Sequence, residues 1–364
     1  MVQHFLNGVR ARAVLVAVLA VLTLGPALSA SRPKEKPAGP TPPDLLLEGG
    51  RKLAYERSVS WEREVKPKRG FWTRLVDVVA GEPEFHYMIR PYSVVTDSRG
   101  RIIVTDPGAA GVHIFDFQQQ KYKFLTRAEK GRDAMAAPQC VAVDAGDNIY
   151  VTDSKTGKIF VFNADGKYQR AIGSIKGGEG YFKRPTGIAI DSAAQRIYVT
   201  DTLRSQIFMM DMQGSVLEKI GKNGNAPGEF NYPTELRLDG EELIVVDAMN
   251  FRVQVLDRSG VFKYAIGKLG DTNGDMFRPK GVAVDSEGDL YIVDGAWGMV
   301  QVFNRKGQLL YYFGGRGVNA GQFQLPAGMF IDRNGRVYVA DSFNHRVQVF
   351  HYYALPKQAK GGAQ

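Results

Sequence analysis

Cysteine is almost absent from this chain, since its 364 residues include a single one, Cys140. A disulfide within one chain is therefore excluded, and stability must come from a buried core. A chain of this length can supply such a core, because a domain of about 300 residues buries roughly three quarters of its extended surface. We expect Cys140 to be a small buried core residue rather than a reactive thiol.

The apolar stretch at residues 13–24 is too short to cross a bilayer comfortably, which takes ~20 residues. Arg10 and Arg12 precede it, and small residues up to Ala30 follow it, which is the layout of a secretory signal peptide. We therefore predict a signal peptide over residues 1–30 and export to the periplasm or outside the cell. A retained N-terminal membrane anchor is the alternative.

The segment after the predicted signal is rich in proline and charge and has no apolar period. Such composition is typical of an extended linker, which we assign to residues 31–50. The tail, residues 354–364, has no strand pattern and is expected to be disordered. The intervening residues, 51–353, form the folded domain.

This domain is built from a repeat. In each of six copies a proline opens a short apolar strand, and an aspartate ends a second strand about fifteen residues later. Successive copies are 46–48 residues apart, a period typical of propeller blades. The prolines are Pro91, Pro138, Pro185, Pro233, Pro279 and Pro326, and the aspartates are Asp106, Asp153, Asp201, Asp247, Asp294 and Asp341.

The fifth copy shows the unit most clearly. Residues 281–284 are apolar throughout, as in a strand buried on both faces, and the Asp-Ser-Glu-Gly turn at 285–288 follows. Two further strands, 290–293 and 300–303, complete the visible pattern, and a fourth strand follows in most copies. Four antiparallel strands per repeat make a propeller blade, so we predict an all-β, six-bladed propeller.

The sixth copy has no fourth strand before the tail. Residues 52–61, upstream of the first repeat, have β composition, and we predict that they supply this outer strand and close the ring. Between this strand and the first blade, the apolar residues at 71, 72, 75, 76 and 79 follow helical spacing. We expect one short amphipathic helix there, packed on the propeller, although a membrane- or partner-docking helix would have the same pattern.

The repeats resemble the NHL family of six-bladed propellers over about residues 51–353. The sixth copy carries the resemblance best, with Asp341-Ser-Phe-Asn-His-Arg-Val-Gln-Val-Phe350, and the fourth keeps Asp247-Ala-Met-Asn-Phe-Arg-Val-Gln-Val255. The other copies depart from the Asn-His-Arg portion. The resemblance implies the fold, whereas such propellers include binding platforms, sensor domains and a few enzymes.

The net positive charge of the chain limits the kinds of partner that it can bind. The formal charge is +9, and removal of Arg10 and Arg12 with the signal leaves +7. Such a charge suits an anionic glycan, small ligand or protein surface. Nucleic acid is disfavoured by the predicted export and by the lack of an aromatic-flanked basic motif. We expect a monomer, with membrane contact only if the N-terminal segment is retained.

The loops that enter the inner strands should surround one mouth of the central channel, the default site for a ligand. Arginine precedes proline in three alternate blades, as Arg90, Arg184 and Arg278, with Lys183 and Lys280 beside them. Three guanidinium groups could converge on one anion, because arginine holds carboxylate or phosphate bidentately. Alternatively, each arginine pairs with an acid inside its own blade.

Carboxylates recur in two settings. The six strand-end aspartates occur in every blade, so we assign them a structural role, bonding backbone amides of the following loop. Glu235 is a lone carboxylate where other blades have a small residue, and it is a candidate ligand contact near Arg184 and Arg278. A buried ion pair is the alternative for Glu235.

The sequence offers few residues that could bind a catalytic metal or a nucleotide. None of the four histidines after the signal, His86, His113, His345 and His351, falls on an inner strand, where zinc-dependent lyases of this fold need imidazoles. Calcium would need several channel-facing carboxylates, and only Glu235 qualifies. The Gly-rich loops lack the Gly-Lys-Ser/Thr of a phosphate loop.

We therefore predict an exported binding or scaffolding propeller without a cofactor or catalytic residues. Its entry face would recognise a protein partner or an anionic ligand. The alternative function is a metal-dependent hydrolase or lyase, with calcium or zinc at the central channel.

Overall fold

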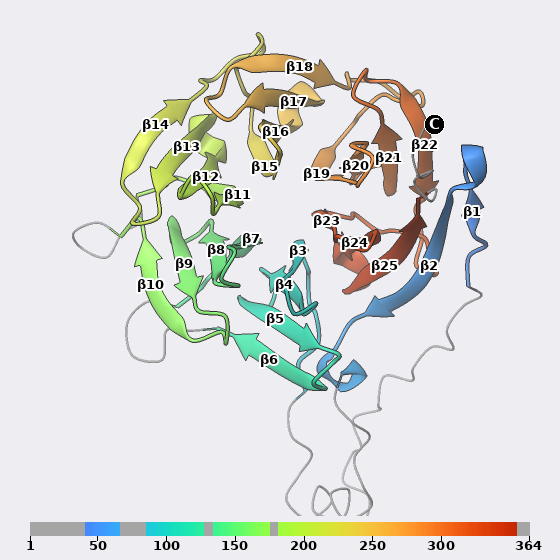
Figure 1. The fold of residues 1–364 in the computed structure, drawn as a ribbon, viewed down its shortest axis with the longest axis horizontal. Helices are drawn as coiled ribbons and strands as arrows, with labels where there is room; N and C mark the ends of the chain where they lie inside the picture. The colour runs from blue at the N-terminus through green and yellow to red at the C-terminus, as the bar shows by residue number, and fades with distance from the viewer. Residues whose placement is uncertain (1–40, 66–84, 127–133, 175–180, 355–364) are drawn as a thin grey trace, which may run out of the picture. The chain divides into compact units, whose positions relative to one another are not determined.

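Each repeat folds into a separate antiparallel sheet, and the six sheets form the blades of a propeller. The structure is a computed structural model that describes residues 41–65, 85–126, 134–174 and 181–354. The predicted signal peptide and the helix expected around residues 71–79 lie outside these ranges. Figure 1 shows the six blades arranged in a ring, with the first strand of each blade nearest the centre.

The six blades follow one another in chain order. Blade one contains β3 (Ser93–Thr96), β4 (Ile102–Asp106), β5 (Gly111–Asp116) and β6 (Lys121–Leu125), and blade two contains β7 (Pro138–Val143), β8 (Ile149–Asp153), β9 (Lys158–Phe162) and β10 (Tyr168–Ile172). Blade three contains β11 (Pro185–Asp191), β12 (Arg196–Asp201), β13 (Gln206–Asp211) and β14 (Val216–Ile220). Blade four contains β15 (Pro233–Asp239), β16 (Glu242–Asp247), β17 (Arg252–Asp257) and β18 (Phe262–Ile266). Blade five contains β19 (Pro279–Val284), β20 (Leu290–Asp294), β21 (Met299–Phe303) and β22 (Leu309–Gly314).

Blade six confirms the predicted closure of the ring. Its own strands are β23 (Met329–Ile331), β24 (Arg336–Asp341) and β25 (Arg346–Tyr353), and the upstream strand β2 (Lys52–Val59) pairs with β25. The register runs from Lys52 opposite Tyr353 to Val59 opposite Val347. A short strand, β1 (Leu45–Leu46), adds a fifth strand outside β2, within the range expected to be linker. Figure 1 shows the blue β2 beside the red β25.

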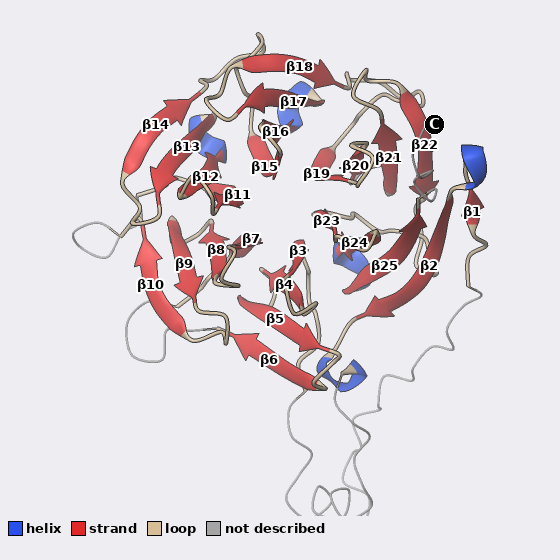
Figure 2. Cartoon of the chain, in the orientation of Figure 1, coloured by secondary structure: helices blue, strands red, loops and turns tan. Residues whose placement is uncertain are grey.

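Regular helix is scarce in the described residues. The five helices are single 3-10 turns: η1 (Glu48–Gly50), η2 (Glu62–Glu64), η3 (Thr202–Arg204), η4 (Ala248–Asn250) and η5 (Ser342–Asn344). Figure 2 shows that strands make up nearly all of the regular structure. Within the described ranges, no helix has the length and apolar character needed to span a membrane.

The hydrophobic core lies mainly between neighbouring blades. For example, Val293 and Val302 of blade five belong to the same buried cluster as Val337 and Val339 of blade six. The alternation of strand side chains puts one set of apolar residues toward each neighbouring blade, which explains the continuous apolar runs. Cys140 is fully buried in such a cluster between blades two and three.

Candidate functional site

The second strand of each blade ends at an aspartate that is fully buried. In blade three, Asp201 accepts hydrogen bonds from the backbone N–H groups of Lys183 (2.9 Å) and Arg184 (3.0 Å). Asp294 does the same for Phe277 and Arg278 in blade five. The carboxylates therefore bind amides of the segment before each proline, not only those of the following loop, and they fix the backbone of the entry face.

The side chains of Arg90, Arg184 and Arg278 are free of these aspartates. All three are exposed, and none makes a side-chain hydrogen bond or ion pair with another described residue. Their backbone N–H groups, in contrast, are held by Asp106, Asp201 and Asp294, respectively. The pairing of each guanidinium with an acid of its own blade is therefore not seen. Lys183 is likewise exposed and unpaired among the described residues.

Lys280, the residue after Pro279 on β19, lies within electrostatic range of the three arginines. The pKa of its ammonium group is lowered to about 8. Burial is the largest cause, and the positive charges of Arg278, Arg184 and Arg90 lower the pKa further. Like charges lower the pKa of a lysine only when they lie close to it. The electrostatic environment of Lys280 therefore includes side chains from blades one, three and five. We call Arg90, Arg184, Arg278 and Lys280 the cationic cluster.

Tyr92 completes this cluster and was not singled out from the sequence. The Lys280 ammonium lies 5.7 Å from the centre of its ring, within the range of a cation–π contact. Burial, together with the Cys140 thiol and Glu235, raises the pKa of Tyr92 above its ordinary value. Its position directly after Pro91, equivalent to Lys280 after Pro279, is the signal that could have identified it.

Glu235 is placed differently from the arginines. It lies on β15, is only 1% exposed, and pairs with Arg237 two residues further along the same strand. Its Oε2 atom has no hydrogen-bond partner among the described residues. Burial raises the pKa of Glu235 to about 7, because the loss of solvent outweighs the opposing attraction of the Arg237 guanidinium. Glu235 therefore lies beneath the surface in an ion pair.

Two glycines allow the Glu235 carboxylate to fit near the centre of the ring. A Cβ atom on Gly281 would lie 2.5 Å from the Ala327 carbonyl oxygen and 3.1 Å from Glu235 Oε2. A Cβ atom on Gly328 would lie 2.7 Å from the Tyr92 carbonyl oxygen and 3.3 Å from Glu235 Oε2. The carboxylate of blade four thus reaches the inner strands of blades five and six.

The histidines lie away from the inner strands. His113 is on β5, fully buried, with Nδ1 2.8 Å from the Tyr122 hydroxyl. His351 is on β25 and contacts Glu56, and His86 contacts Glu62. His345 follows η5, with its Nδ1 bonded to the Ile89 carbonyl. These positions give no cluster of imidazoles.

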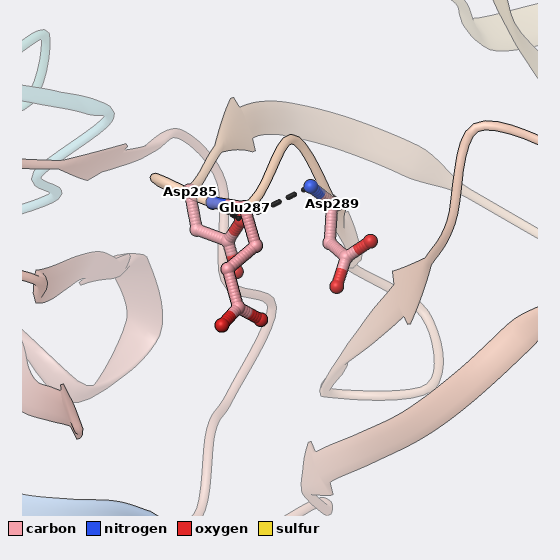
Figure 3. Close-up of side chains that lie close together, drawn as sticks. All are labelled: Asp285, Glu287 and Asp289. Carbon is pink, nitrogen blue, oxygen red and sulfur yellow. Dashed lines mark hydrogen bonds between the residues drawn. The ribbon is translucent and has the colours of Figure 1, made fainter. Parts of the chain in front are cut away.

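One group of three carboxylates comes together among the described residues. Asp285, Glu287 and Asp289 lie in the turn between β19 and β20, with ligand atoms within 4.8 Å of one another (Figure 3). Asp285 Oδ1 accepts the backbone N–H groups of Glu287 (2.9 Å) and Asp289 (3.0 Å). Glu287 also pairs with Arg51 at 3.0 Å. These contacts form a turn and join it to the segment before β2, at the end of β19 opposite Lys280.

Comparisons with known proteins agree with this architecture. The profile of a six-bladed β-propeller domain matches residues 140–197 and 190–253, and the NHL repeat profile matches residues 323–350. No curated protein sequence matches the chain.

Solved structures share the fold at low sequence identity. A gluconolactonase from Xanthomonas campestris matches with a TM-score of 0.57 and 16% identity, covering 88% of this chain and 99% of its own. A streptogramin B lyase matches with a TM-score of 0.54 and 15% identity, covering 73% and 94%. An auxiliary nutrient binding protein from Bacteroides thetaiotaomicron matches with a TM-score of 0.55 and 12% identity, covering 73% and 70%. The ring of six blades and the first profile agree on a six-bladed β-propeller, and the segment at residues 323–350 is similar to an NHL repeat.

Proposed function

We propose that this chain is an exported binding propeller whose entry face recognises an anionic ligand or an acidic group of a protein partner. The observation that carries the proposal is the equivalent placement of Arg90, Arg184 and Arg278 on the entry face, where a buried aspartate holds each backbone N–H and each guanidinium is exposed without an ion pair among the described residues. Holding like charges together is unfavourable, and a bound anion would relieve that cost. Arginine also offers the bidentate geometry that suits carboxylate, sulfate and phosphate.

The surroundings of the cluster support an anion rather than a cation. Glu235, the carboxylate that approaches the centre of the ring, is buried and already paired with Arg237. The strand-end aspartates are fully buried and accept backbone amides. The cluster therefore keeps most of its positive charge for a partner. The nutrient-binding protein of the same fold gives a precedent for a binding role only at the level of the fold.

Inorganic sulfate is a suitable probe, because its charge stays constant near neutral pH. In isothermal titration calorimetry, we expect the Arg184→Ala/Arg278→Ala variant to bind sulfate more weakly, by about 1.5–3 kcal/mol for each charge-assisted hydrogen bond that it can no longer form. Binding should also fall as salt rises. The thermal stability of the variant should change little, because exposed charges contribute little to folding.

A matched control is available on the opposite face. Lys306 and Arg333 are exposed, and their side chains make no ion pair with another described residue. The Lys306→Ala/Arg333→Ala variant has the same change in net charge and should bind sulfate as the unmodified chain does. Equal weakening in both double variants would mean that only net charge matters. Unfolding of the arginine variant would assign those side chains a structural role.

A metal-dependent hydrolase or lyase is the second candidate, because a lyase and a gluconolactonase have the same fold. The donor set argues against it. Glu235 is paired with Arg237, and the described carboxylate group of Asp285, Glu287 and Asp289 lies in a turn outside the cationic cluster. Metal analysis of the purified protein decides between the two candidates, because stoichiometric calcium or zinc would favour the enzyme.

Export is the part of the proposal that depends on residues 1–30. Mass spectrometry of the native protein should find a mature N-terminus near Ala30 or Ser31. A mass that includes Met1 would show that the segment is retained as an anchor.

A further inference from the structure

The face around the cationic cluster has an unusual composition. We define the entry-face ring as the three residues before each repeat proline and the three after each strand-end aspartate. Antiparallel topology puts both sets at the same end of the blades. Backbone hydrogen bonds join them directly, as from Met249 N–H to the Asn231 carbonyl (3.0 Å) and from Phe343 N–H to the Gln324 carbonyl (3.1 Å).

Large apolar side chains protrude from this ring in five of the six blades. The exposed ones are Ile89 (52%), Leu203 (49%), Tyr232 (43%), Met249 (53%), Phe277 (55%), Leu325 (37%) and Phe343 (49%). Each lies within two residues of a buried aspartate or proline, and Leu203, Met249 and Phe343 are the middle residues of the 3-10 turns η3, η4 and η5. A soluble surface rarely gathers so many large apolar side chains unless something covers them.

The same ring contains no acidic residue. Its thirty-six positions, all in the described part of the chain, include no aspartate or glutamate, whereas six are lysine or arginine. The cations are Arg90, Lys155, Lys183, Arg184, Arg204 and Arg278. The turns at the opposite end of the blades are acidic by comparison, and examples are Asp144, Asp147, Asp239, Asp285 and Asp289. The two faces of the propeller therefore differ in charge.

We propose that the entry-face ring docks on an anionic phospholipid surface, with the cationic cluster holding a headgroup phosphate. This inference rests on the proposed anion site and specifies its ligand. Peripheral membrane binding needs apolar side chains to enter the headgroup region and basic side chains to attract anionic lipid. A carboxylate at such a surface would be repelled. The ring itself has none, and the loops that lead into it at the same end of the blades contain Glu229, Asp271 and Asp275, of which Glu229 and Asp275 pair with Lys222 and Lys268.

The arrangement of the apolar side chains also favours a broad surface. They come from five blades and lie at the same end of the propeller as the arginines, so they share the face that would meet a lipid layer. The docking needs no apolar segment before the propeller. It therefore differs from anchoring through residues 13–24, and its readout must be local to the ring.

A fluorophore placed on the ring gives that local readout. Cys140 is fully buried, so an environment-sensitive dye can be attached to the full chain at a new cysteine in a Phe343→Cys variant. The matched site is Val261→Cys, which is 62% exposed in a turn on the opposite face. Vesicles of phosphatidylcholine with phosphatidylglycerol should shift the emission of the dye at position 343 to the blue, but not at 261. Pure phosphatidylcholine should have little effect.

Two sets of substitutions then test the chemistry. Arg184→Ala/Arg278→Ala should weaken partitioning roughly 25-fold, since each basic residue near an anionic surface contributes about fivefold. Lys306→Ala/Arg333→Ala should not weaken it. The apolar test changes position 343 itself, so the dye is attached at an Ile89→Cys variant instead. In this background, Met249→Ser/Phe277→Ser/Phe343→Ser should weaken partitioning at least roughly tenfold. The control Leu217→Ser/Val261→Ser/Leu310→Ser removes equally exposed apolar side chains elsewhere and should not.

The outcomes separate this inference from the proposed function. Sulfate binding without any response to anionic vesicles would overturn the membrane proposal and keep the anion site. A shift caused by a soluble peptide of alternating glutamate and leucine, but not by vesicles, would also overturn it in favour of a protein partner. Equal responses at 343 and 261 would mean nonspecific adsorption, and failure of both sulfate and vesicles would contradict both proposals.

Discussion

Arg237 of blade four donates a hydrogen bond of 2.9 Å to the main-chain carbonyl of Met329 in blade six. The same guanidinium pairs with Glu235, so one side chain links a buried carboxylate to a blade two positions away in the ring. Met329 opens the inner strand β23. The Glu235–Arg237 pair therefore joins the inner strands of blades four and six.

The buried carboxylate predicts a pH dependence of stability. Burial raises the pKa of Glu235 from 4.5 to about 7 in the folded state. The folded protein therefore binds more protons than the unfolded one between these values. The stabilising contribution is complete below about pH 4.5 and is lost as the pH rises to about 7.

The stability of the Glu235→Gln variant should not fall over this pH range, because glutamine does not ionise. Denaturant titrations from pH 4 to 8 should show the unmodified chain losing about 1–3 kcal/mol of unfolding free energy relative to the variant. The matched control is Glu56→Gln, because Arg336 and His351 outweigh burial and lower the pKa of Glu56. Relative to Glu56→Gln, the unmodified chain should gain unfolding free energy as the pH rises from 4. Parallel stability curves for the unmodified chain and Glu235→Gln would contradict the assignment.

Lys280 predicts a pH dependence of binding. With its pKa lowered to about 8, the ammonium group loses its charge as the pH rises through that value. Sulfate affinity should therefore fall between about pH 7 and 9, and Lys280→Gln should bind weakly without this fall. Calorimetry across that range makes the measurement. An identical pH profile for Lys280→Gln would exclude Lys280 from the site.

The closing strand predicts a difference between two truncations. Deletion of residues 31–62 removes β2, exposes the edge of β25, and should cost several kcal/mol, an order of magnitude expected from the loss of strand pairing and apolar burial. Deletion of residues 31–43 leaves β1 and β2 in place and should change little. Equal melting temperatures for the two truncated proteins would show that β2 does not stabilise the ring.

Close packing of the inner strands predicts that Gly281→Ala is costly. The new methyl group would meet the Ala327 carbonyl, and backbone cannot move aside as a flexible side chain can. We expect a loss of about 2–4 kcal/mol in unfolding free energy. Gly240→Ala is the comparison, because open space surrounds Gly240 and only its φ of +53° opposes a side chain, at a cost of about 1 kcal/mol. Similar costs at both positions would argue against steric contact at the centre.

The fold could be predicted because its signals are local and repeated. Each blade has its own proline, turn and strand-end aspartate, and six copies in phase define the architecture. The outer strand β2 was also predictable, because the sixth copy lacks a partner for β25. The strand β1 was not, since the short run of leucines at residues 45–47 has no alternation.

The site could be predicted only in part. The arginines share one phase of the repeat, so the sequence places Arg90, Arg184 and Arg278 on one face. Whether long side chains of alternate blades meet depends on the diameter of the ring, which no local pattern encodes. Arg237 was missed as the partner of Glu235, although residues two apart on a strand share one face. Its contact with Met329, ninety-two residues later, could not be predicted, because that distance becomes short only after the ring closes.

The central claim is that the cationic cluster binds an anion. Its most direct test is anomalous diffraction from crystals grown with increasing selenate, whose selenium marks the position of the anion. We expect a peak within hydrogen-bond distance of at least two of Arg90, Arg184 and Arg278, with occupancy that rises with concentration and disappears in the Arg184→Ala/Arg278→Ala variant. Peaks confined to other surfaces, or an empty cluster with the three arginines paired to carboxylates, would contradict the claim.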